Sequence, residues 1–322
     1  MNNDSLFHEG ELSMQTRIGA RAQAVSTERV IQRFIPEAAM YFISQQTMAV
    51  VSSRDAEGNV WASMLFGSPG FLNAETERQL RLDHILCFTA TGYPVWQNLK
   101  QDPEIGILLI ELSSRRRLRI NGRVRQDSNS YLIEVDRFYP NCPKYIQTRN
   151  LTVTGNIMNT RETNTASGER LTPEQCKQLS RADTFFVASA HPKAGCDASH
   201  RGGHPGFIEV LNAQRLRITE YAGNGMFNTL GNFESYPYAG LVFPGFENNR
   251  ILQLTGQVEV LWHEYAKGEK EFSQPYYWEF KLESWQESVI PIELKWEFLE
   301  YSPFLPMIPM RQPVAAGGTG KS

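Results

Sequence analysis

Cysteine is scarce in this sequence, and long apolar segments are missing. The four cysteines, at positions 87, 142, 176 and 196, form no Cys-x-x-Cys pair, which argues against a disulfide framework and a thiolate zinc site. No apolar run is long enough to span a bilayer. The first residues, MNNDSLFHEGEL, lack the basic and apolar regions of a signal peptide. We therefore expect a cytoplasmic protein with no membrane partner.

A strong excess of one charge is also missing. The net charge is −3 over 322 residues, so we expect no general attraction to nucleic acid. The basic run Arg115–Arg117 has no wider basic surface around it, and we interpret it as an exposed hairpin. Hydrophobic residues make up 41% of the chain, and its length allows two domains that each bury a core of their own.

The most informative stretch runs from Cys196 to Ile208 and reads CDASHRGGHPGFI, between two apolar runs. Gly202 and Gly203 allow the backbone to come close to a ligand. Arg201, beside them, has the side chain best shaped to grip a phosphate with two parallel hydrogen bonds. The stretch therefore predicts an anion-binding corner between two strands.

Two histidines in this stretch resemble metal ligands. His200 and His204 are spaced like the helical pair of a zinc protease, but the intervening glycines and Pro205 oppose a helix. No glutamate follows His200, and we therefore expect no metal site.

The same corner occurs twice in the chain. Residues 62–71 read ASMLFGSPGF, and residues 198–207 read ASHRGGHPGF. Further identities recur at nearly constant spacing, pairing Leu80, Arg81, Asn98, Pro103, Gly106, Leu118 and Gly122 with Leu216, Arg217, Asn232, Pro237, Gly240, Leu252 and Gly256. We interpret this pattern as a tandem duplication of one domain-sized unit.

Strand signals dominate the first unit. Apolar and alternating runs predict strands over 48–53, 60–65, 85–89, 105–111 and 117–125, with a helix over 95–101. This order suggests a small, mostly antiparallel barrel. One or two helices are predicted over 17–34, packing outside this barrel, and a further helix over 37–44.

The remaining segments complete the expected organisation. Residues 126–180 are expected to join the repeats, with one helix near Pro143 and another announced by the Thr172 start signal. A further strand is predicted over 292–298. The expected division is an N-terminal helical segment (1–45), a first barrel (46–150), a linker with a helix (151–182), a second barrel with an extension (183–306) and a flexible tail (307–322).

These residues resemble a known family. The segments ASHRGGHPGF, RLRITEYAGN, TLGNFESYPYAGLVF and LQLTGQVEVLW are similar to pyridoxamine 5′-phosphate oxidase-like FMN-binding split-barrel proteins, as are RRRLRINGRVR and YPNCPKYIQTR. The likeness is to an uncharacterised branch with tandem repeats. It implies a mainly β fold with flanking helices, namely two tandem split barrels with FMN in a groove between barrels.

The resemblance also implies a cofactor site, carried over position by position. In the second repeat the phosphate site would use Ser199, Arg201, Thr219 and Asn224, together with the glycine pair. Lys144 and Arg149, which follow the first barrel, would reach across to the phosphate or close over the ring.

The matching site of the first repeat has lost its positive charge. Ser63 matches Ser199, but Leu65 replaces Arg201. Strict spacing places Asp83 opposite Thr219, whereas Thr89 ends the apparent strand and is the alternative. We therefore expect one strong FMN site on the second barrel and a degenerate one on the first.

FMN performs the redox step itself, so the protein needs to bind it, shape access to it and tune its potential. We expect an FMN-dependent oxidoreductase that passes hydride through FMN N5 between NAD(P)H or a small substrate and the flavin, with no catalytic side chain identified. The alternative is a non-catalytic flavin- or haem-type binding protein or carrier. The sequence leaves open the substrate, the electron donor and acceptor, the number of occupied sites, and whether barrels pair within one chain or in a homodimer.

Overall fold

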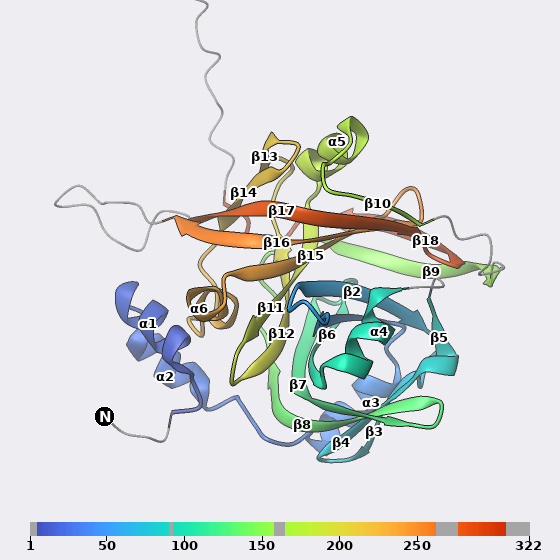
Figure 1. Ribbon diagram of the computed structural model, residues 1–322. Helices are drawn as coiled ribbons and strands as arrows, with labels where there is room; N and C mark the ends of the chain where they lie inside the picture. Colours follow the sequence, from blue (N-terminus) through green and yellow to red (C-terminus); the bar gives the residue numbers. More distant parts are fainter. Residues whose placement is uncertain (1–4, 90–92, 158–164, 262–275, 307–322) are drawn as a thin grey trace, which may run out of the picture.

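The structure, a computed structural model, describes residues 5–89, 93–157, 165–261 and 276–306 (Figure 1). Strands dominate, and the helices flank two large antiparallel sheets. No helix in the described ranges combines the length and the apolar character needed to cross a bilayer. The segment predicted as a flexible tail, 307–322, lies outside these ranges.

The first sheet has the strand order β3-β4-β8-β7-β6-β1-β2-β5. Its strands are β1 (Met48–Arg54), β2 (Val60–Gly67), β3 (Leu72–Thr76), β4 (Gln79–Asp83), β5 (Cys87–Phe88), β6 (Glu104–Glu111), β7 (Arg116–Asp127) and β8 (Ser130–Pro140). Its helices are α3 (Glu37–Ser44), the short 3₁₀ turn η1 (His84–Leu86) and α4 (Pro94–Gln101).

The second sheet has the order β12-β11-β15-β16-β17-β14-β13. Its strands are β11 (Thr184–His191), β12 (Gly195–Gly202), β13 (Ile208–Asn212), β14 (Arg215–Glu220), β15 (Tyr238–Gly245), β16 (Arg250–Leu261) and β17 (Tyr276–Val289), and β10 (Ala166–Gly168) pairs with β17. Its helices are α5 (Pro173–Arg181) and α6 (Asn228–Ser235).

Four elements lie outside these two sheets. Two N-terminal helices, α1 (Glu9–Arg17) and α2 (Arg21–Glu28), precede the first barrel. The strands β9 (Thr148–Ile157) and β18 (Ile292–Glu300) pair with each other in a separate two-stranded sheet. This small sheet joins the segment after the first barrel to the end of the second.

The two large sheets share one topology. Read backwards, the second order is β13-β14-β17-β16-β15-β11-β12, which repeats β3-β4-β8-β7-β6-β1-β2 strand for strand. Even an irregularity recurs, because the pairing register shifts at Asn121/Gly122 in one sheet and at Thr255/Gly256 in the other. The chain is therefore two tandem split β-barrels with flanking helices, and the repeat predicted from the sequence is confirmed.

Local sequence signals explain several element boundaries. In the turn between β1 and β2, the Asp55 carboxylate accepts the backbone N–H groups of Glu57 and Asn59, and Gly58 has a φ of 88° that favours glycine. At the start of α5, Thr172 and Gln175 form the reciprocal capping box that the sequence predicted. These short-range bonds fix where the chain turns.

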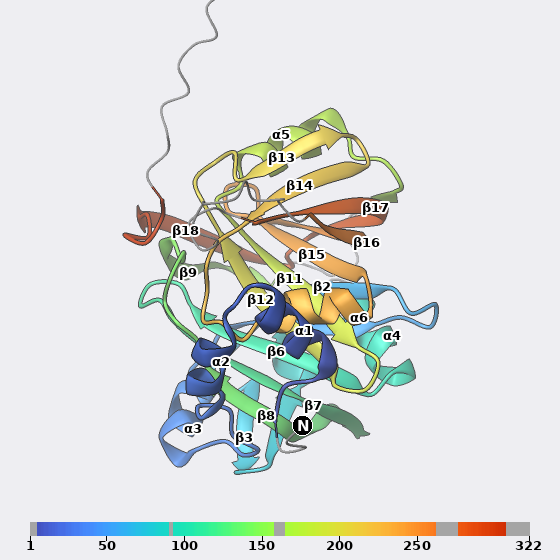
Figure 2. The same ribbon diagram turned by 90° about the vertical axis from the view of Figure 1, so that its left-hand side faces the viewer.

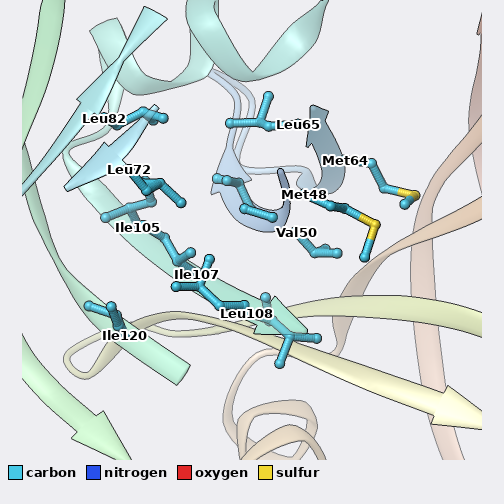
Figure 3. Close-up of a cluster of buried hydrophobic side chains, with 14 of the residues drawn as sticks. Met48, Val50, Met64, Leu65, Leu72, Leu82, Ile105, Ile107, Leu108 and Ile120 are labelled. Carbon is cyan, nitrogen blue, oxygen red and sulfur yellow. The ribbon is translucent and has the colours of Figure 1, made fainter. Parts of the chain in front are cut away.

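The buried apolar side chains form two main cores, and the first extends across the barrel interface to residues of β11, β12, β15 and β16. Side chains from β1, β2, β6 and β7 meet in the first core, which Figure 3 shows with Leu65 among its labelled members. The second core gathers around Trp278, which is fully buried. Burial of this apolar surface is the main force that holds each barrel together.

The barrels pack through two glycines that the repeat relates to each other. A Cβ atom added at Gly106 on β6 would lie 2.6 Å from the Asp197 Cα on β12. A Cβ added at Gly240 on β15 would lie 2.4 Å from the backbone nitrogen of Ala62 on β2. At each glycine, the absence of a side chain lets the strand backbones of the two barrels come into contact. The two contacts are related by an approximate two-fold axis.

Three predictions about elements are wrong. The segment 126–180 is not only a connection, because β8 completes the first sheet through its pairing with β4 and β7. No helix begins at Pro143, where the chain makes a turn. The N-terminal helices do not pack only outside the first barrel, since α1 lies against α6 of the second (Figure 2).

Candidate functional site

A cleft opens where the second barrel meets the first barrel and the N-terminal helices. Its cavity volume is about 160 Å³. The second barrel lines it with β12, the end of β14, the loop 221–225 and the start of α6. The first barrel contributes Arg117 and Arg119 from β7 and the segment 141–145, and the link between α1 and α2 covers one side.

The cleft brings together most of the residues that the sequence singled out. Those that line it are Ser199, Arg201, Gly202, Thr219, Asn224 and Lys144. In the chain these residues extend from Lys144 to Asn224, and the barrel interface brings them to one place.

The other predicted residues lie elsewhere. Gly203 packs behind the cleft, where its N–H donates to the Asp183 carbonyl. Arg149 is buried in an ion pair with the same Asp183, 2.6 Å away, and its guanidinium stacks on Phe246 at 4.0 Å. Its position therefore serves the packing of the chain after the first barrel.

The two first-barrel residues are also outside the cleft. Ser63 is fully buried and accepts a hydrogen bond from Gln253 at 3.0 Å. Thr89 accepts the indole N–H of Trp96 at 3.1 Å. The counterpart of Thr219 is Asp83. The Thr219 backbone N–H donates to the Phe207 carbonyl, and the Asp83 backbone N–H donates to the carbonyl of Phe71, which the repeat relates to Phe207.

A buried ionic network crosses from the first barrel to the cleft. Arg119 pairs with Asp197 at 2.8 Å, and the same carboxylate accepts hydrogen bonds from Asn121 and the Tyr139 hydroxyl. Arg119 also donates to the Ser199 hydroxyl oxygen at 2.6 Å. A buried charge without a partner destabilises the folded state, so removing either Arg119 or Asp197 should lower the stability of the protein.

Ser199 is the meeting point of two guanidinium groups. Its oxygen accepts from Arg119 at 2.6 Å and from Arg201 at 2.7 Å, and Arg201 is itself paired with Glu220 at 2.8 Å. A hydroxyl oxygen has two acceptor lone pairs and one proton to donate. With both lone pairs occupied, the Ser199 O–H remains available as a donor at the cleft wall.

Arg117 is a cleft residue that the sequence interpretation placed on an exposed hairpin, which is wrong. Its Nε donates to the Cys142 carbonyl at 2.8 Å, but no carboxylate of the described ranges pairs with it. Burial, Arg119 and Arg201 together lower the pKa of Arg117 to about 9. At neutral pH it therefore stays charged, as a cation without a counter-charge.

A signal for this side of the cleft was present in the sequence. Arg117, Arg119 and Asn121 alternate with Leu118 and Ile120, so the three polar side chains share one face of β7. Sequence alone could not show that this face meets a second barrel.

His200 adds a neutral group to the cleft wall. Burial and the surrounding arginines hold the pKa of His200 well below its usual range. Its Nδ1 lies 3.4 Å from a guanidinium nitrogen of Arg117, which assigns the ring proton to Nε2. That Nε2 is buried with no hydrogen-bond partner in the described structure.

Two residues of the cleft wall, from different segments, carry backbone strain. Tyr145 and Phe227, both lining residues, have φ angles of 66° and 61°, a region that costs non-glycine residues about 1–3 kcal/mol. The Tyr145 hydroxyl donates to the Ala222 carbonyl, and its ring lies 5.1 Å from that of Tyr221. Two aromatic rings are thus held at the wall of a cationic cleft.

The equivalent place in the first barrel is apolar. Pairing registers relate Leu65 to Arg201, Gln253 to Arg119 and Ile251 to Arg117. Leu65 and Ile251 are both buried in the first core (Figure 3 labels Leu65). The equivalent place therefore has none of the three guanidinium groups, and the loss at position 65 is the one expected from the sequence.

A second group of polar side chains lies beneath α1. His8, Glu9 and His191 each bring one ligand-type atom within 4.8 Å of the others. The two imidazole rings are stacked at 4.0 Å, and the His8 Nε2 is already bonded to Asn232 at 2.9 Å. This arrangement packs α1 on the second barrel and leaves His8 without a free nitrogen for an ion.

Next to this group, Glu11 is buried in the contact between α1 and α6. It accepts the His8 backbone N–H at 2.8 Å and a hydrogen bond from Asn228, a cleft residue. Arg137 lies 3.9 Å away, where its charge lowers the pKa of Glu11, and the charge of Asp197 raises it slightly. Burial raises the pKa of Glu11 to about 7, so its charge changes near neutral pH.

This pKa predicts a pH dependence. An unfolded glutamate titrates near pH ~4.3, so between that value and about 7 the folded protein binds a proton that the unfolded chain has lost, and stability falls as pH rises. Glu11→Gln removes this titration. Its free energy of unfolding relative to wild type is expected to rise by about 1–3 kcal/mol between acidic and neutral pH.

Chemical denaturation of both proteins at several pH values measures this difference. Glu57→Gln, in an exposed turn, is the control and should show no such trend. A difference between Glu11→Gln and wild type that stays constant with pH would contradict the prediction.

The cleft can hold an anion and a flat ring. Ser199 has a free O–H, and two other lining residues, His200 and Asn141, each have a buried side-chain nitrogen without a hydrogen-bond partner in the described ranges. Donors of this kind beside an uncompensated arginine fit a phosphate group. The residues present therefore fit a phosphorylated ligand that carries an aromatic ring.

Residues 35–134 match the family model described as pyridoxamine 5′-phosphate oxidase. None of the curated proteins compared matches the chain.

Solved structures match over about one barrel. A protein of the pyridoxinephosphate oxidase family from Clostridium acetobutylicum is 11% identical, with 39% of this chain and 92% of that chain covered and a TM-score of 0.27. A FAD-binding protein from Mesorhizobium loti is 7% identical (40% and 99% covered, TM-score 0.27). The haem storage protein HutZ from Vibrio cholerae is 13% identical (35% and 91% covered, TM-score 0.25). At these values the fold assignment rests on the strand order of the two sheets.

Proposed function

We propose that this protein binds one FMN in the cleft between its barrels and acts as an oxidoreductase; the match of residues 35–134 to the pyridoxamine 5′-phosphate oxidase family model supports this proposal. The observation that carries the proposal is the cationic cleft itself, with a serine donor held between two arginines. A flavin mononucleotide combines the phosphate and the flat ring that such a cleft suits.

The residues divide into two roles. The phosphate would lie against Ser199 and the loop that contains Asn224, near Arg201. The ring would lie beside the paired aromatic side chains Tyr145 and Tyr221. When bound, FMN would supply the electron-transfer chemistry, and the chain's part is to hold it, limit water and set access.

Asn224→Asp tests the cofactor proposal. The change keeps the side-chain oxygen that accepts the Met226 N–H, but places a negative charge beside the proposed phosphate. We expect FMN affinity to fall about 10-fold or more, since like charges in a partly buried site repel. Flavin absorbance after dialysis and a fluorescence titration measure the change.

Asn248→Asp, in an exposed turn where the side chain accepts the Arg250 N–H, is the matched control. A wild-type protein that takes up no FMN would overturn the cofactor proposal, and a Soret band on titration with haemin would support a haem-type binder instead. If bound FMN is reduced by neither NADH nor NADPH under anaerobic conditions, the nicotinamide version of the oxidoreductase is wrong.

A further inference from the structure

The charges around the cleft do not balance within the protein. Arg119 is paired with Asp197, and Arg201 is paired with Glu220. Arg117 and Lys144 line the same cleft, and neither has a carboxylate partner in the part of the chain that the structure describes. Two positive charges therefore remain uncompensated, both from the first barrel and the segment after it.

The bonding of Arg117 leaves part of its guanidinium open. Its Nε is used by the Cys142 carbonyl, and its Nη1 has only the 3.4 Å contact to His200. Its Nη2 has no hydrogen-bond acceptor in the described ranges. An arginine fork needs acceptors for its five N–H donors, and phosphate oxygens match its geometry.

Arg119 and Arg201 are in a different situation. Each donates to Ser199 and each is held by a carboxylate. They fix the serine oxygen as an acceptor and turn its proton outward. Their effect on a ligand is thus through Ser199, which makes them positioning residues.

Charge matching identifies the anion. Two uncompensated positive charges correspond to one phosphate monoester, which carries about −1.5 to −2 at neutral pH. A single negative charge would leave the cleft positive, and a diphosphate would leave it negative. The cleft is therefore suited to one terminal phosphate.

We propose that Arg117, supplied by the first barrel with Lys144 beside it, anchors the phosphate of the ligand bound on the second barrel. This inference rests on the proposed function and adds the residue of the first barrel, Arg117, that holds the phosphate. Arg117 would then decide between a phosphorylated flavin and the same flavin without phosphate.

Arg117→Met tests this by comparing FMN with riboflavin, which lacks only the phosphate. We expect the affinity for FMN to fall about 10–100-fold, because a charge-assisted hydrogen bond to the phosphate is lost, while the affinity for riboflavin stays within about two-fold. Arg117→Gln provides a second variant if methionine perturbs folding. Arg125→Met, an exposed arginine on the same strand, is the control and should change neither affinity.

The ligand-free protein gives a second readout. Removing a crowded, uncompensated cation should leave the Tm of the ligand-free variant equal to or above that of wild type. A large fall in Tm would mean that Arg117 is structural and would overturn the proposal. Equal losses for FMN and riboflavin, or no loss for either, would overturn it as well.

Failure of the proposed function has a distinct signature. If wild type binds neither flavin, the FMN proposal is wrong, and inorganic phosphate replaces flavin as the probe. Phosphate should then raise the Tm of wild type and Arg125→Met but not of Arg117→Met. An equal rise in all three would show that Arg117 does not anchor phosphate.

Discussion

Asp197→Ala is expected to lower the free energy of unfolding by about 3–5 kcal/mol. The carboxylate lies on β12, and its partners Arg119, Asn121 and Tyr139 all belong to the first barrel. Removing it leaves the Arg119 guanidinium buried without a counter-charge at the barrel interface. A buried ion pair adds little net stability when intact, but breaking one is costly because the remaining charge has lost its hydration.

Equilibrium denaturation monitored by tryptophan fluorescence measures this loss. Glu209→Ala is the matched control, since it breaks an exposed ion pair with Arg217 and should cost about 0–1 kcal/mol. Asp197→Ala should also bind FMN more weakly, because Arg119 would no longer hold Ser199 in place. A stability loss below about 1 kcal/mol would mean that Arg119 finds another partner or water.

The second large effect is expected at the paired interface glycines. Gly106→Ala would bring a methyl group within 2.6 Å of the Asp197 Cα, and Gly240→Ala would bring one within 2.4 Å of the Ala62 backbone nitrogen. Both obstacles are backbone atoms, so a side chain cannot simply rotate away. Each substitution should cost about 1–3 kcal/mol or more, because the barrels must separate locally.

The double variant distinguishes packing at one interface from two local effects. If both glycines serve the same interface, the double variant should lose less than the sum of the single variants, since the first substitution already separates the barrels. Gly223→Ala is the control, because nothing lies within 4 Å of its added Cβ. Single variants as stable as this control would contradict the close packing of the barrels.

Much of the fold was readable from the sequence because its signals are local or repeated. The helix α3 and the hairpin of β1 and β2 follow from apolar periodicity and turn chemistry. The matching glycines Gly106 and Gly240 followed from the repeat, and they occupy equivalent places in the structure. The short strands β3 and β4 were missed, because five-residue strands carry little periodic signal.

The candidate site could be predicted only on the second barrel. Arg201, Thr219 and Asn224 belong to one repeat, the family resemblance of that repeat placed them together, and the structure gathers them in the cleft. Thr89 was suggested by the end of an apparent strand, whereas backbone pairing gives that place to Asp83. A boundary of one short strand is too weak a signal to fix a binding residue.

By itself the sequence determined the duplication, the strand-rich class and the loss of an arginine at Leu65. The tertiary structure alone decided which charges meet. Arg117 and Arg119 reach the cleft because β7 of one barrel packs on β12 of the other, and contacts between residues some 80 positions apart have no local signal. It also decided that Arg149 is held by Asp183, since burial and pairing depend on neighbours that only folding brings together.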